Sequence, residues 1–396
     1  MIIYKNIVDK ISVSSDKKTK QKNYLKQGKL PIIDQGHNLI GGYTDNINTC
    51  LPCDLPVIVF GDHTRAVKYI DFKFGVGADG VKVLRPKEGI FPKYLYYATL
   101  YLVLRLEDKG YARHYQHLEK KSIYVPDTLE QQRIVERIEE MFSQLDSAVE
   151  TLNKTKQQLA VYRQAVLKDA FEGSFTNHNC FDIELQWSSE EEIKSLPDIP
   201  KEWKYVSLSE LGDLGRGKSK HRPRNDPQLF EDGKYPFLQT SEVKSAKYTI
   251  TEYSKMYGDF GLKQSKLWPK GTLCITIAAN IAETAFLGID ACFPDSVVGF
   301  TPYQYVIPEY IKHFLESQKL RLWAFAPATA QKNINLDTLE NLIVPYCSIQ
   351  EQKEIVAEIE ARMSICDSIE KTVDTALQQA EAMRQSILKK AFEGKL

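Results

Sequence analysis

The chain has 396 residues, of which 43% are hydrophobic and 26% are charged, so it has the length of two or three globular domains and not the composition of a disordered protein. Lys plus Arg and Asp plus Glu number 52 each, so no overall basic excess points to nucleic acid. The most apolar long window, residues 273–293, contains Asn280, Glu283 and Asp290, which argues against a membrane span. The first ten residues lack the apolar core of a secretory signal, and we expect a cytoplasmic protein.

The N-terminal part of the chain is locally basic. Residues 5–30 carry eight Lys against Asp9 and Asp16. Lys residues on loops are suited to neutralising phosphate groups, which requires charge more than fixed geometry. The alternative is a solvated charged face, which is what charge runs usually are.

The seven Cys residues are an odd number in a chain without a signal, and we expect reduced thiols. Cys50 and Cys53 form one C-x-x-C, but a zinc site would need two further ligands, and only the scattered His37 and His63 lie nearby. A redox motif would need a strand before it and a helix after it, whereas "TCLPCDLP" is rich in proline. We interpret both cysteines as incidental loop residues and predict no metal site.

Two further stretches of the first half resemble functional motifs. Residues 74–80, "FGVGADG", contain G-x-G-x-x-G, but "VKVLRP" follows with the pattern of a strand instead of the helix that a nucleotide site requires. We therefore predict a glycine-rich turn without a cofactor. The Tyr-rich segment 94–106 has helical spacing and is predicted to be a core helix and not a platform for stacking bases.

Two long segments of the sequence are copies of each other. Residues 130–175 align with residues 351–396 at a constant offset of 221 residues, without a gap, and 20 of the 46 positions are identical. The first copy contains "AFEG" near its end, and the second contains the same four letters at the equivalent place. The chain therefore contains an internal repeat.

Apolar residues recur every seven positions in both copies. The rows are Ile138, Leu145, Leu152, Leu159 and Val166 in the first copy and Ile359, Cys366, Val373, Ala380 and Ile387 in the second. Sustained heptads predict a coiled coil, and Gly173 and Gly394 are good helix ends. At 1.5 Å per residue, each helix would be about 65 Å long. The alternative is two amphipathic helices that lie on globular cores.

The segments in front of the two helices also resemble each other. The paired pieces are "GKLPIIDQ" (28–35) with "GKYPFLQT" (233–240), "LPCDLPVIVFGD" (51–62) with "LWPKGTLCITIA" (267–278), and "SIYVPDTLEQQ" (122–132) with "NLIVPYCSIQEQ" (341–352). Residues 176–200, with six acidic residues against Lys194, have the composition of a linker. We therefore divide the chain into a first globular domain at 1–127, a helix at 128–175, a linker at 176–200, a second globular domain at 201–347 and a helix at 348–396.

The second globular domain is also basic in its loops. Residues 201–270 hold 14 Lys and Arg against nine acidic residues, and "GRGKSKHRPR" (215–224) is the densest stretch. Arg, Asn and Gln side chains can pair with base edges through two hydrogen bonds, whereas Lys supplies charge alone. The residues that we predict to contact DNA are Lys17, Lys18, Lys20, Lys22, Asn38, His63, Arg65, Arg113, Gln116, Arg216, Lys218, Lys220, Arg222, Arg224, Asn280, Gln331 and Lys332. Among them we expect Arg222 and Arg224 to contact bases.

The repeat and the unit that follows it resemble a known family. The "EQ…IV…I" helix starts at Glu130 and Glu351, the two "AFEG" endings and "IPKEWKYVSLSELGDL" (199–214) are similar to the specificity subunits of type I restriction-modification systems. The resemblance covers essentially the whole chain. It implies an α+β fold, in which two α/β target-recognition domains are separated by two long antiparallel coiled-coil helices. One departure is that the first unit begins at Met1 without a Trp-containing opening strand.

The resemblance also implies a function and partners. Each target-recognition domain would read one half of a bipartite, asymmetric site in double-stranded DNA, and the helices would dock two methyltransferase subunits. Restriction and translocase subunits would join for cleavage. S-adenosylmethionine, ATP and Mg would belong to those partners, and this chain would hold no cofactor and no catalytic residue.

Two other functions fit the same sequence. A coiled-coil adaptor between proteins, without sequence-specific DNA binding, would also need two globular units and long helices. A fragment of a restriction enzyme with its own activity is the second alternative, although no Ser/His/Asp or Cys/His arrangement can be assembled from the sequence.

Overall fold

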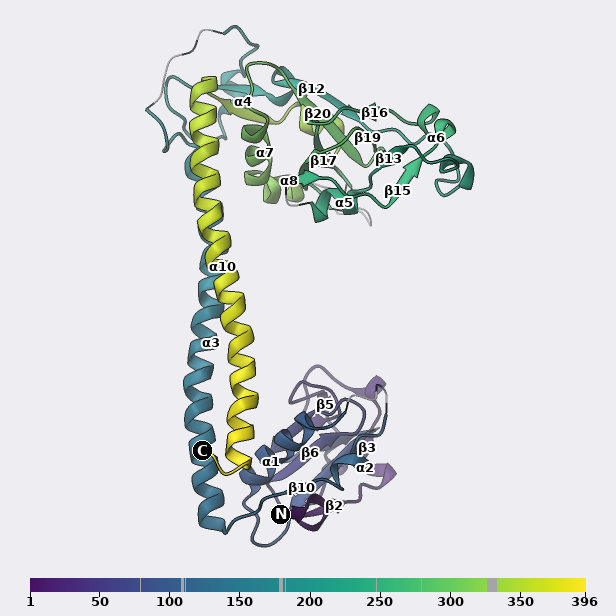
Figure 1. The fold of residues 1–396 in the computed structure, drawn as a ribbon, viewed down its shortest axis with the longest axis vertical. Coiled ribbons are helices and arrows are strands. Elements are labelled where there is room, and N and C mark those ends of the chain that lie inside the picture. Colours follow the sequence, from purple (N-terminus) through teal and green to yellow (C-terminus); the bar gives the residue numbers. More distant parts are fainter. Residues whose placement is uncertain are drawn as a thin grey trace. The chain divides into compact units, whose positions relative to one another are not determined.

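The structure is a computed structural model, which describes residues 1–78, 80–107, 110, 112–177, 181, 183–246, 248–278, 280–325 and 333–396. The chain divides into two compact units. Unit 1 comprises Met1–Thr155 and Thr372–Leu396, and unit 2 comprises Lys156–Lys371. Each unit therefore contains one globular part and a portion of both long helices, α3 (Thr128–Phe171) and α10 (Ile349–Phe392), which Figure 1 labels.

The globular part of unit 1 is built from two four-stranded sheets and a helix. Its elements are β1 (Ile2–Ile3), β2 (Val8–Ile11), β3 (Lys18–Thr19), β4 (Leu30–Ile33), β5 (Gly42–Thr44), β6 (Val57–Gly61), β7 (Val67–Ile70), β8 (Gly75–Gly77), β9 (Val81–Pro86), α1 (Pro92–Leu104), α2 (Tyr115–Leu118) and β10 (Ser122–Ile123). One sheet has the order β2-β9-β6-β7 and is antiparallel. The other has the order β3-β8-β4-β5, in which β3 and β4 run parallel to β8.

Strand β6 shows how unit 1 is layered. Successive side chains of a strand point to opposite faces of the sheet. Ile58 and Phe60 are buried in one cluster with the α1 side chains, whereas Val57 and Val59 are buried in another with Ile33 of the second sheet. The antiparallel sheet therefore lies between α1 and the second sheet.

Helix α1 confirms the prediction of a core helix for the Tyr-rich segment. Pro92 stands at its first turn, where the missing N–H costs no helical hydrogen bond. Tyr94, Leu95, Ala98 and Leu102 are each at most 1% exposed. The glycine-rich stretch is also followed by a strand, β9, as predicted.

Unit 2 repeats this layering. Its globular elements are α4 (Glu190–Ile193), β11 (Lys204–Ser207), β12 (Gly212–Arg216), β13 (Tyr235–Phe237), α5 (Thr240–Ser245), β14 (Thr249–Ile250), β15 (Lys255–Tyr257), α6 (Asp259–Lys263), β16 (Leu267–Trp268), β17 (Leu273–Thr276), β18 (Thr284–Leu287), β19 (Ala291–Cys292), β20 (Val297–Pro302), α7 (Pro308–Ser317), α8 (Lys319–Phe325), α9 (Leu336–Glu340) and β21 (Ile343–Tyr346). The sheets have the orders β12-β20-β17-β18-β14 and β15-β13-β19-β16, and β11 pairs with β21.

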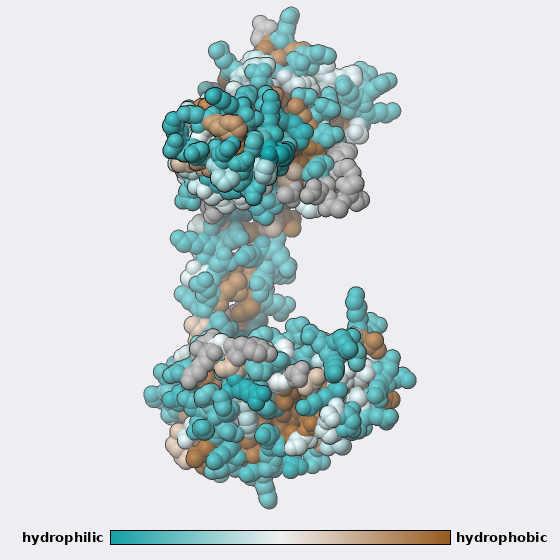
Figure 2. Space-filling model, turned by 90° about the vertical axis from the view of Figure 1, so that its right-hand side faces the viewer, coloured by the Kyte–Doolittle hydropathy of each residue, from teal (hydrophilic) through white to brown (hydrophobic). Residues whose placement is uncertain are grey.

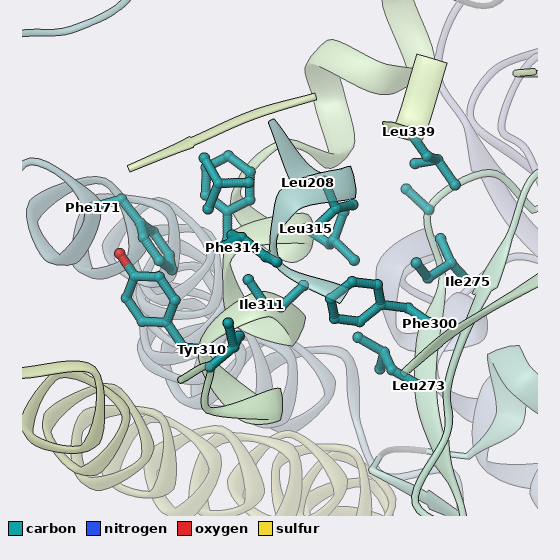
Figure 3. Close-up of a cluster of buried hydrophobic side chains, with 14 of the residues drawn as sticks. Phe171, Leu208, Leu273, Ile275, Phe300, Tyr310, Ile311, Phe314, Leu315 and Leu339 are labelled. Atoms are coloured by element: carbon teal, nitrogen blue, oxygen red, sulfur yellow. The ribbon is translucent and has the colours of Figure 1, made fainter. Parts of the chain in front are cut away.

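The main core of unit 2 lies between its first sheet, α7 and α3. Figure 3 shows Ile275 and Phe300 of the sheet on one side and Phe314 of α7 on the other, with Phe171 of α3 beside Tyr310. The rings of Phe171 and Tyr310 have centroids 5.1 Å apart. The ends of the long helices are therefore part of the globular core and not appendages to it.

Apolar side chains of the stretch 176–200 also pack on this core. Phe181 and Trp187 form a cluster of rings with Tyr346, and the centroids of Phe181 and Tyr346 are 5.1 Å apart. Trp187 also forms an isolated β-bridge with Val206 of β11. This part of the predicted linker is thus anchored to unit 2.

The two long helices pair antiparallel in each unit. In unit 2, the Arg163 guanidinium donates to Asp367 at 2.6 Å and lies 3.6 Å from the Met363 sulfur. In unit 1, Arg384 forms an ion pair with Asp146 and lies over the ring of Phe142. At the offset of 221 residues these are the same contacts, with the roles of the two copies exchanged. The antiparallel helices and the α+β fold that the sequence predicts are confirmed.

A buried glutamine fixes the start of each long helix to its globular part. Gln131 accepts a hydrogen bond from the Phe91 N–H at 2.8 Å and donates to the Gly89 and Pro126 carbonyls. Its side chain satisfies backbone groups that would otherwise be buried without partners in front of α1.

The repeat places Gln352 in the same role. Gln352 accepts from the Ile307 N–H at 2.8 Å and donates to the Tyr305 and Cys347 carbonyls. Both glutamines are at most 1% exposed. The identity of these two residues in the repeat is therefore a requirement of folding.

The neighbouring glutamates have different partners in the two units. Glu351 is fully buried, and its carboxylate accepts hydrogen bonds from the Trp203 indole at 3.1 Å and from Thr176. In unit 1 the equivalent Glu130 is partly exposed and pairs with Arg133. Identical residues of the repeat therefore do not always have the same surroundings.

The cysteine motif has no sign of reactivity. Cys50 and Cys53 are free thiols, and burial raises the pKa of the Cys53 thiol, which disfavours the thiolate. Among the described residues no group of His, Cys, Asp and Glu is arranged to hold a metal ion. Within the same residues, no helix combines the length and the apolar character needed to cross a membrane.

Candidate nucleic-acid interface

Three parallel strands gather predicted contact residues at one edge of unit 1. Because β3, β8 and β4 run in the same direction, their carboxyl ends meet at one edge of the sheet. Residues 20–22, Ala78 and residues 34–38 follow these ends. Gly77 is needed there, because a Cβ on it would lie 2.7 Å from the Tyr24 hydroxyl and from Cβ of Asp34.

A buried aspartate adds two further segments to this edge. Asp62, at the end of β6, is 3% exposed, accepts a hydrogen bond from the Tyr115 N–H at 2.8 Å and pairs with Lys82 at 3.2 Å. The next residue, His63, has its Nδ1 3.2 Å from the Ala112 carbonyl oxygen. Asp62 therefore holds the β6–β7 turn against the start of α2.

We call residues 20–22, 34–38, 62–66 and 112–116 the loop edge of unit 1. It brings together seven of the predicted residues: Lys20, Lys22, Asn38, His63, Arg65, Arg113 and Gln116. Lys20, Lys22, Asn38, Arg113 and Gln116 are exposed there. Lys17 and Lys18 lie at the start of β3, and the Lys17 ammonium donates to the Asn48 carbonyl.

Two strand ends of the first sheet carry the predicted residues of unit 2. Strands β12 and β17 both pair antiparallel with β20, so the ends of both strands lie beside the start of β20 at Val297 and Val298. Arg216 ends β12, and the turn that contains Asn280 follows β17. We call residues 216–224, 277–278, 280–283 and 294–296 the loop edge of unit 2.

One aspartate organises the arginines of this edge. Arg216 Nε donates to the Asp295 carbonyl at 3.1 Å, and Arg224 pairs with the Asp295 carboxylate at 2.9 Å. Arg222 donates to the backbone carbonyls of Ser219 and His221. All three guanidinium groups thus have internal partners, and base contacts by Arg222 and Arg224 stay a prediction. Arg222 uses only Nη1 and Arg224 only Nη2 in these contacts, and a guanidinium group has further N–H donors.

The loop that carries these arginines is held at several points. His221 lies 2.8 Å from the Asp226 carboxylate, and this hydrogen bond keeps the pKa of Asp226 below its ordinary value. The Lys220 N–H donates to the Gln264 carbonyl, and Ser265 donates to that of Lys218. The exposed Lys218 and Lys220 side chains are therefore presented from an ordered backbone.

The remaining predicted residues divide into two groups. The Asn280 side-chain oxygen accepts a hydrogen bond from Lys244 at 3.3 Å, which couples this turn to α5. Gln331 and Lys332 lie outside the residues that the structure describes.

Sequence reasoning missed the residues that hold the loops. Asp62, Asp295 and Lys68 bind backbone groups or other loop side chains, and Lys68 donates to the Asp34 carbonyl at 2.9 Å. Burial lowers the pKa of the buried Lys68 despite the nearby Asp34 carboxylate. A polar residue directly after a fully apolar strand, as in "VIVFGD", is the signal that could have identified Asp62.

The two loop edges have the chemistry of a surface for a polyanion. They combine exposed ammonium and guanidinium groups with Asn and Gln side chains, and these groups can neutralise phosphate and pair with base edges, respectively. Figure 2 shows that hydrophilic residues cover most of the face of each unit that is turned to the viewer.

Replacing Lys18, Lys20 and Lys22 together by Ala should weaken DNA binding evenly across sequences. Each phosphate contact that is lost should lower the slope of log affinity against log salt by about 0.9. Lys17 is left unchanged because its ammonium is bound to Asn48. Salt titrations of binding measure the slope. The matched control is Lys87→Ala, because Lys87 follows the carboxyl end of β9, whereas the loop edge lies beside the start of this strand. A changed sequence preference in the triple variant would contradict the assignment.

Comparison with known proteins gives concordant matches. The family model for the type I restriction modification DNA specificity domain matches residues 5–160 and 200–379. The chain is 28% identical to the type I restriction enzyme EcoBI specificity subunit of Escherichia coli over 295 residues, which cover 71% of this chain but only 60% of that protein. It is 25% identical to the EcoKI specificity subunit of Escherichia coli strain K12 over an alignment of 417 residues, which covers 96% of this chain and 85% of that protein.

A solved structure supports the fold. A structure that describes complex assembly and conformational transition of the type I R-M system matches with a TM-score of 0.73. The match covers 100% of this chain and 97% of that chain, at 15% identity. At this identity the likeness concerns the fold.

Proposed function

Because the chain belongs to the type I restriction modification DNA specificity family, we propose that it is the DNA-recognition subunit of a type I restriction-modification complex. Each unit reads one half of a bipartite, asymmetric site in double-stranded DNA through its loop edge. The chain itself is not catalytic. A subunit with this role works where the DNA is, in the cytoplasm.

One observation carries this proposal. Both units place basic or amide side chains after equivalent strands, yet the side chains themselves differ between the units: His63 and Arg65 follow β6, and Asn280 follows β17. Phosphate contacts position a protein on DNA, and base contacts specify the sequence. Two equivalent scaffolds with different loop residues are therefore suited to reading two different half-sites.

The long helices supply the binding surface for partners. Since 20 of 46 positions are identical in the two copies, the helices present similar surfaces to two copies of one partner, the methyltransferase subunit. Restriction and translocase subunits complete the complex for cleavage. S-adenosylmethionine, ATP and Mg act in those partners and not in this chain.

Exchange of one unit tests the proposal. Replacing residues 201–346 by the same unit of another specificity subunit should change one half of the methylated sequence and leave the other half as it was. Methylome sequencing of cells that carry the exchanged chain with its methyltransferase subunit measures both halves at once. A change in both half-sites would contradict independent reading by the two units.

Family membership does not favour a coiled-coil adaptor as the function of this chain. The two functions also differ in their dependence on salt. A DNA-recognition subunit loses affinity for DNA steeply as salt rises, whereas an adaptor shows no such dependence. Incubating the chain alone with S-adenosylmethionine and DNA tests for an activity of its own, and the proposal predicts no methyl transfer.

A further inference from the structure

Each unit contains a hollow at the carboxyl end of a long helix. In unit 2 a hollow of about 320 Å³ lies between the last turns of α3, the end of α7 and strand β21. In unit 1 a hollow of about 310 Å³ lies between the last turns of α10 and the end of α1. The proposed DNA-reading loops contribute no residue to either hollow.

The two hollows are equivalent in the repeat. Three polar residues, spaced four apart on one helix face, line each of them. They are Gln164, Lys168 and Glu172 in unit 2 and Gln385, Lys389 and Glu393 in unit 1. At the offset of 221 residues these are the same three residues. An arginine completes each lining, Arg321 and Arg105, each 13 residues after the proline that begins α7 or α1.

Packing within the chain does not account for this identity. Gln164, Lys168, Gln385 and Lys389 are all exposed. Within residues 160–172, all of which the structure describes, five other positions are exposed in both copies. Those positions are 160, 161, 162, 165 and 169, and at every one of them the two copies differ. Within residues 160–172, the exposed positions that the two copies share are therefore those that line the hollows. Further from the helix end, Gln157 and Gln158 are also exposed and identical in the two copies, and they line neither hollow.

The lining also indicates what the hollows bind. Each has two cations and one carboxylate, which leaves one positive charge in excess: Lys168 and Arg321 against Glu172, and Lys389 and Arg105 against Glu393. Apolar side chains form much of the remaining wall, including Phe171 and Phe314 in unit 2, which Figure 3 shows side by side, and Leu104 in unit 1. In unit 2, Tyr205, Ser317 and Gln318 also line the hollow. One carboxylate beside an apolar side chain complements such a lining in charge and polarity.

We propose that each hollow receives an acidic side chain from one of two copies of the methyltransferase subunit. The inference rests on the proposed function, and it assigns the docking to four polar residues in each unit. Because both sites contain the same four residue types, Gln, Lys, Glu and Arg, one surface segment of the partner serves both. The other side chains of the two walls differ, with Tyr101 in unit 1 and Phe314 in unit 2, because they come from globular parts that differ in sequence.

Charge reversal in the two hollows tests the inference. Lys168→Glu and Lys389→Glu should each weaken the binding of one methyltransferase subunit by about thirtyfold or more, because a buried charge pair is replaced by two like charges. The double variant should lose both subunits at concentrations that saturate the wild-type chain. Native mass spectrometry, with the methyltransferase subunit of the same system as the probe, counts the bound copies.

The controls separate charge at the hollow from general effects. Lys390→Glu reverses the adjacent exposed lysine, which does not line the hollow, and should leave binding unchanged. Lys168→Arg keeps the positive charge and should retain both subunits. Circular dichroism should show the same helix content in all variants, because these side chains are exposed.

Two outcomes would overturn the inference in distinguishable ways. A double variant that still binds two methyltransferase subunits as tightly as the wild-type chain would exclude the hollows as docking sites and leave the proposed function standing. A wild-type chain that binds no methyltransferase subunit would overturn the proposed function, and this inference with it.

Discussion

Replacing Gln352 by Leu should destabilise unit 2 by about 3 to 5 kcal/mol, because several buried backbone groups lose their partners. The Ile307 N–H at the start of α7 loses the Gln352 side-chain oxygen as its acceptor. The Cys347 carbonyl loses the Gln352 side-chain N–H donor, which lies 2.9 Å away. Leucine has a similar volume but no group that could replace these hydrogen bonds. The equivalent change Gln131→Leu should act on unit 1 in the same way.

Hydrogen exchange with peptide resolution measures this effect in each unit. Gln352→Leu should lower protection in α7 and leave α1 protected, and Gln131→Leu should do the reverse. Lys353→Leu, an exposed neighbour of Gln352, is the control and should change protection in neither helix. Equal loss of protection in α1 and α7 in either glutamine variant would show that the glutamine does not act within its own unit.

Replacing Asp62 by Ala should abolish reading of one half-site while the fold is kept. The change removes the acceptor of the Tyr115 N–H and leaves the Lys82 ammonium without its carboxylate. The β6–β7 turn and the start of α2 then keep only the backbone hydrogen bond from the His114 N–H to the Asp62 carbonyl and the contact of His63 with the Ala112 carbonyl, so Arg65, Arg113 and their neighbours are held less firmly. We expect about hundredfold weaker binding to the specific site, the equivalent of one or two lost base contacts at about 1–3 kcal/mol each.

Two further variants make this result specific. Asp62→Asn keeps an acceptor for the Tyr115 N–H but loses the charge opposite Lys82, and should lie between wild type and Asp62→Ala. Asp71→Ala alters an exposed aspartate just after β7, at the end of the sheet away from the loops, and should bind as wild type does. Binding assays with each half-site altered in turn measure the result. An equal loss of preference at both half-sites would contradict the role of Asp62.

The long helices could be predicted from the sequence because their signals are local. The heptad rows, the absence of proline and the terminal Gly173 and Gly394 are all read within one segment, and α3 and α10 extend as these signals indicate. The internal repeat added a comparison that required no structure. The equivalence of Gln131 and Gln352 was visible as an identity, although its cause, a buried hydrogen-bond network, was not.

The loop edges could be predicted only as sets of residue types. Their assembly depends on the parallel pairing of β3 and β4 with β8, and those strands are two to four residues long and distant in sequence. Pairing of such short strands is decided by tertiary packing and not by a local pattern. For the same reason the sequence did not reveal that Asp295 binds Arg216 and Arg224.

The two arginine–aspartate pairs of the long helices have a consequence for the origin of the chain. In unit 2 the arginine comes from the first copy and the aspartate from the second, and in unit 1 the origins are reversed. In a two-fold homodimer, a residue of the first subunit contacts a different residue of the second, and the same contact occurs again with the two subunits exchanged. The interface of such a dimer is therefore complementary to itself. The paired helices therefore have the contacts of a homodimer whose two subunits have become one polypeptide. A single copy of the repeat already encodes both sides of that interface.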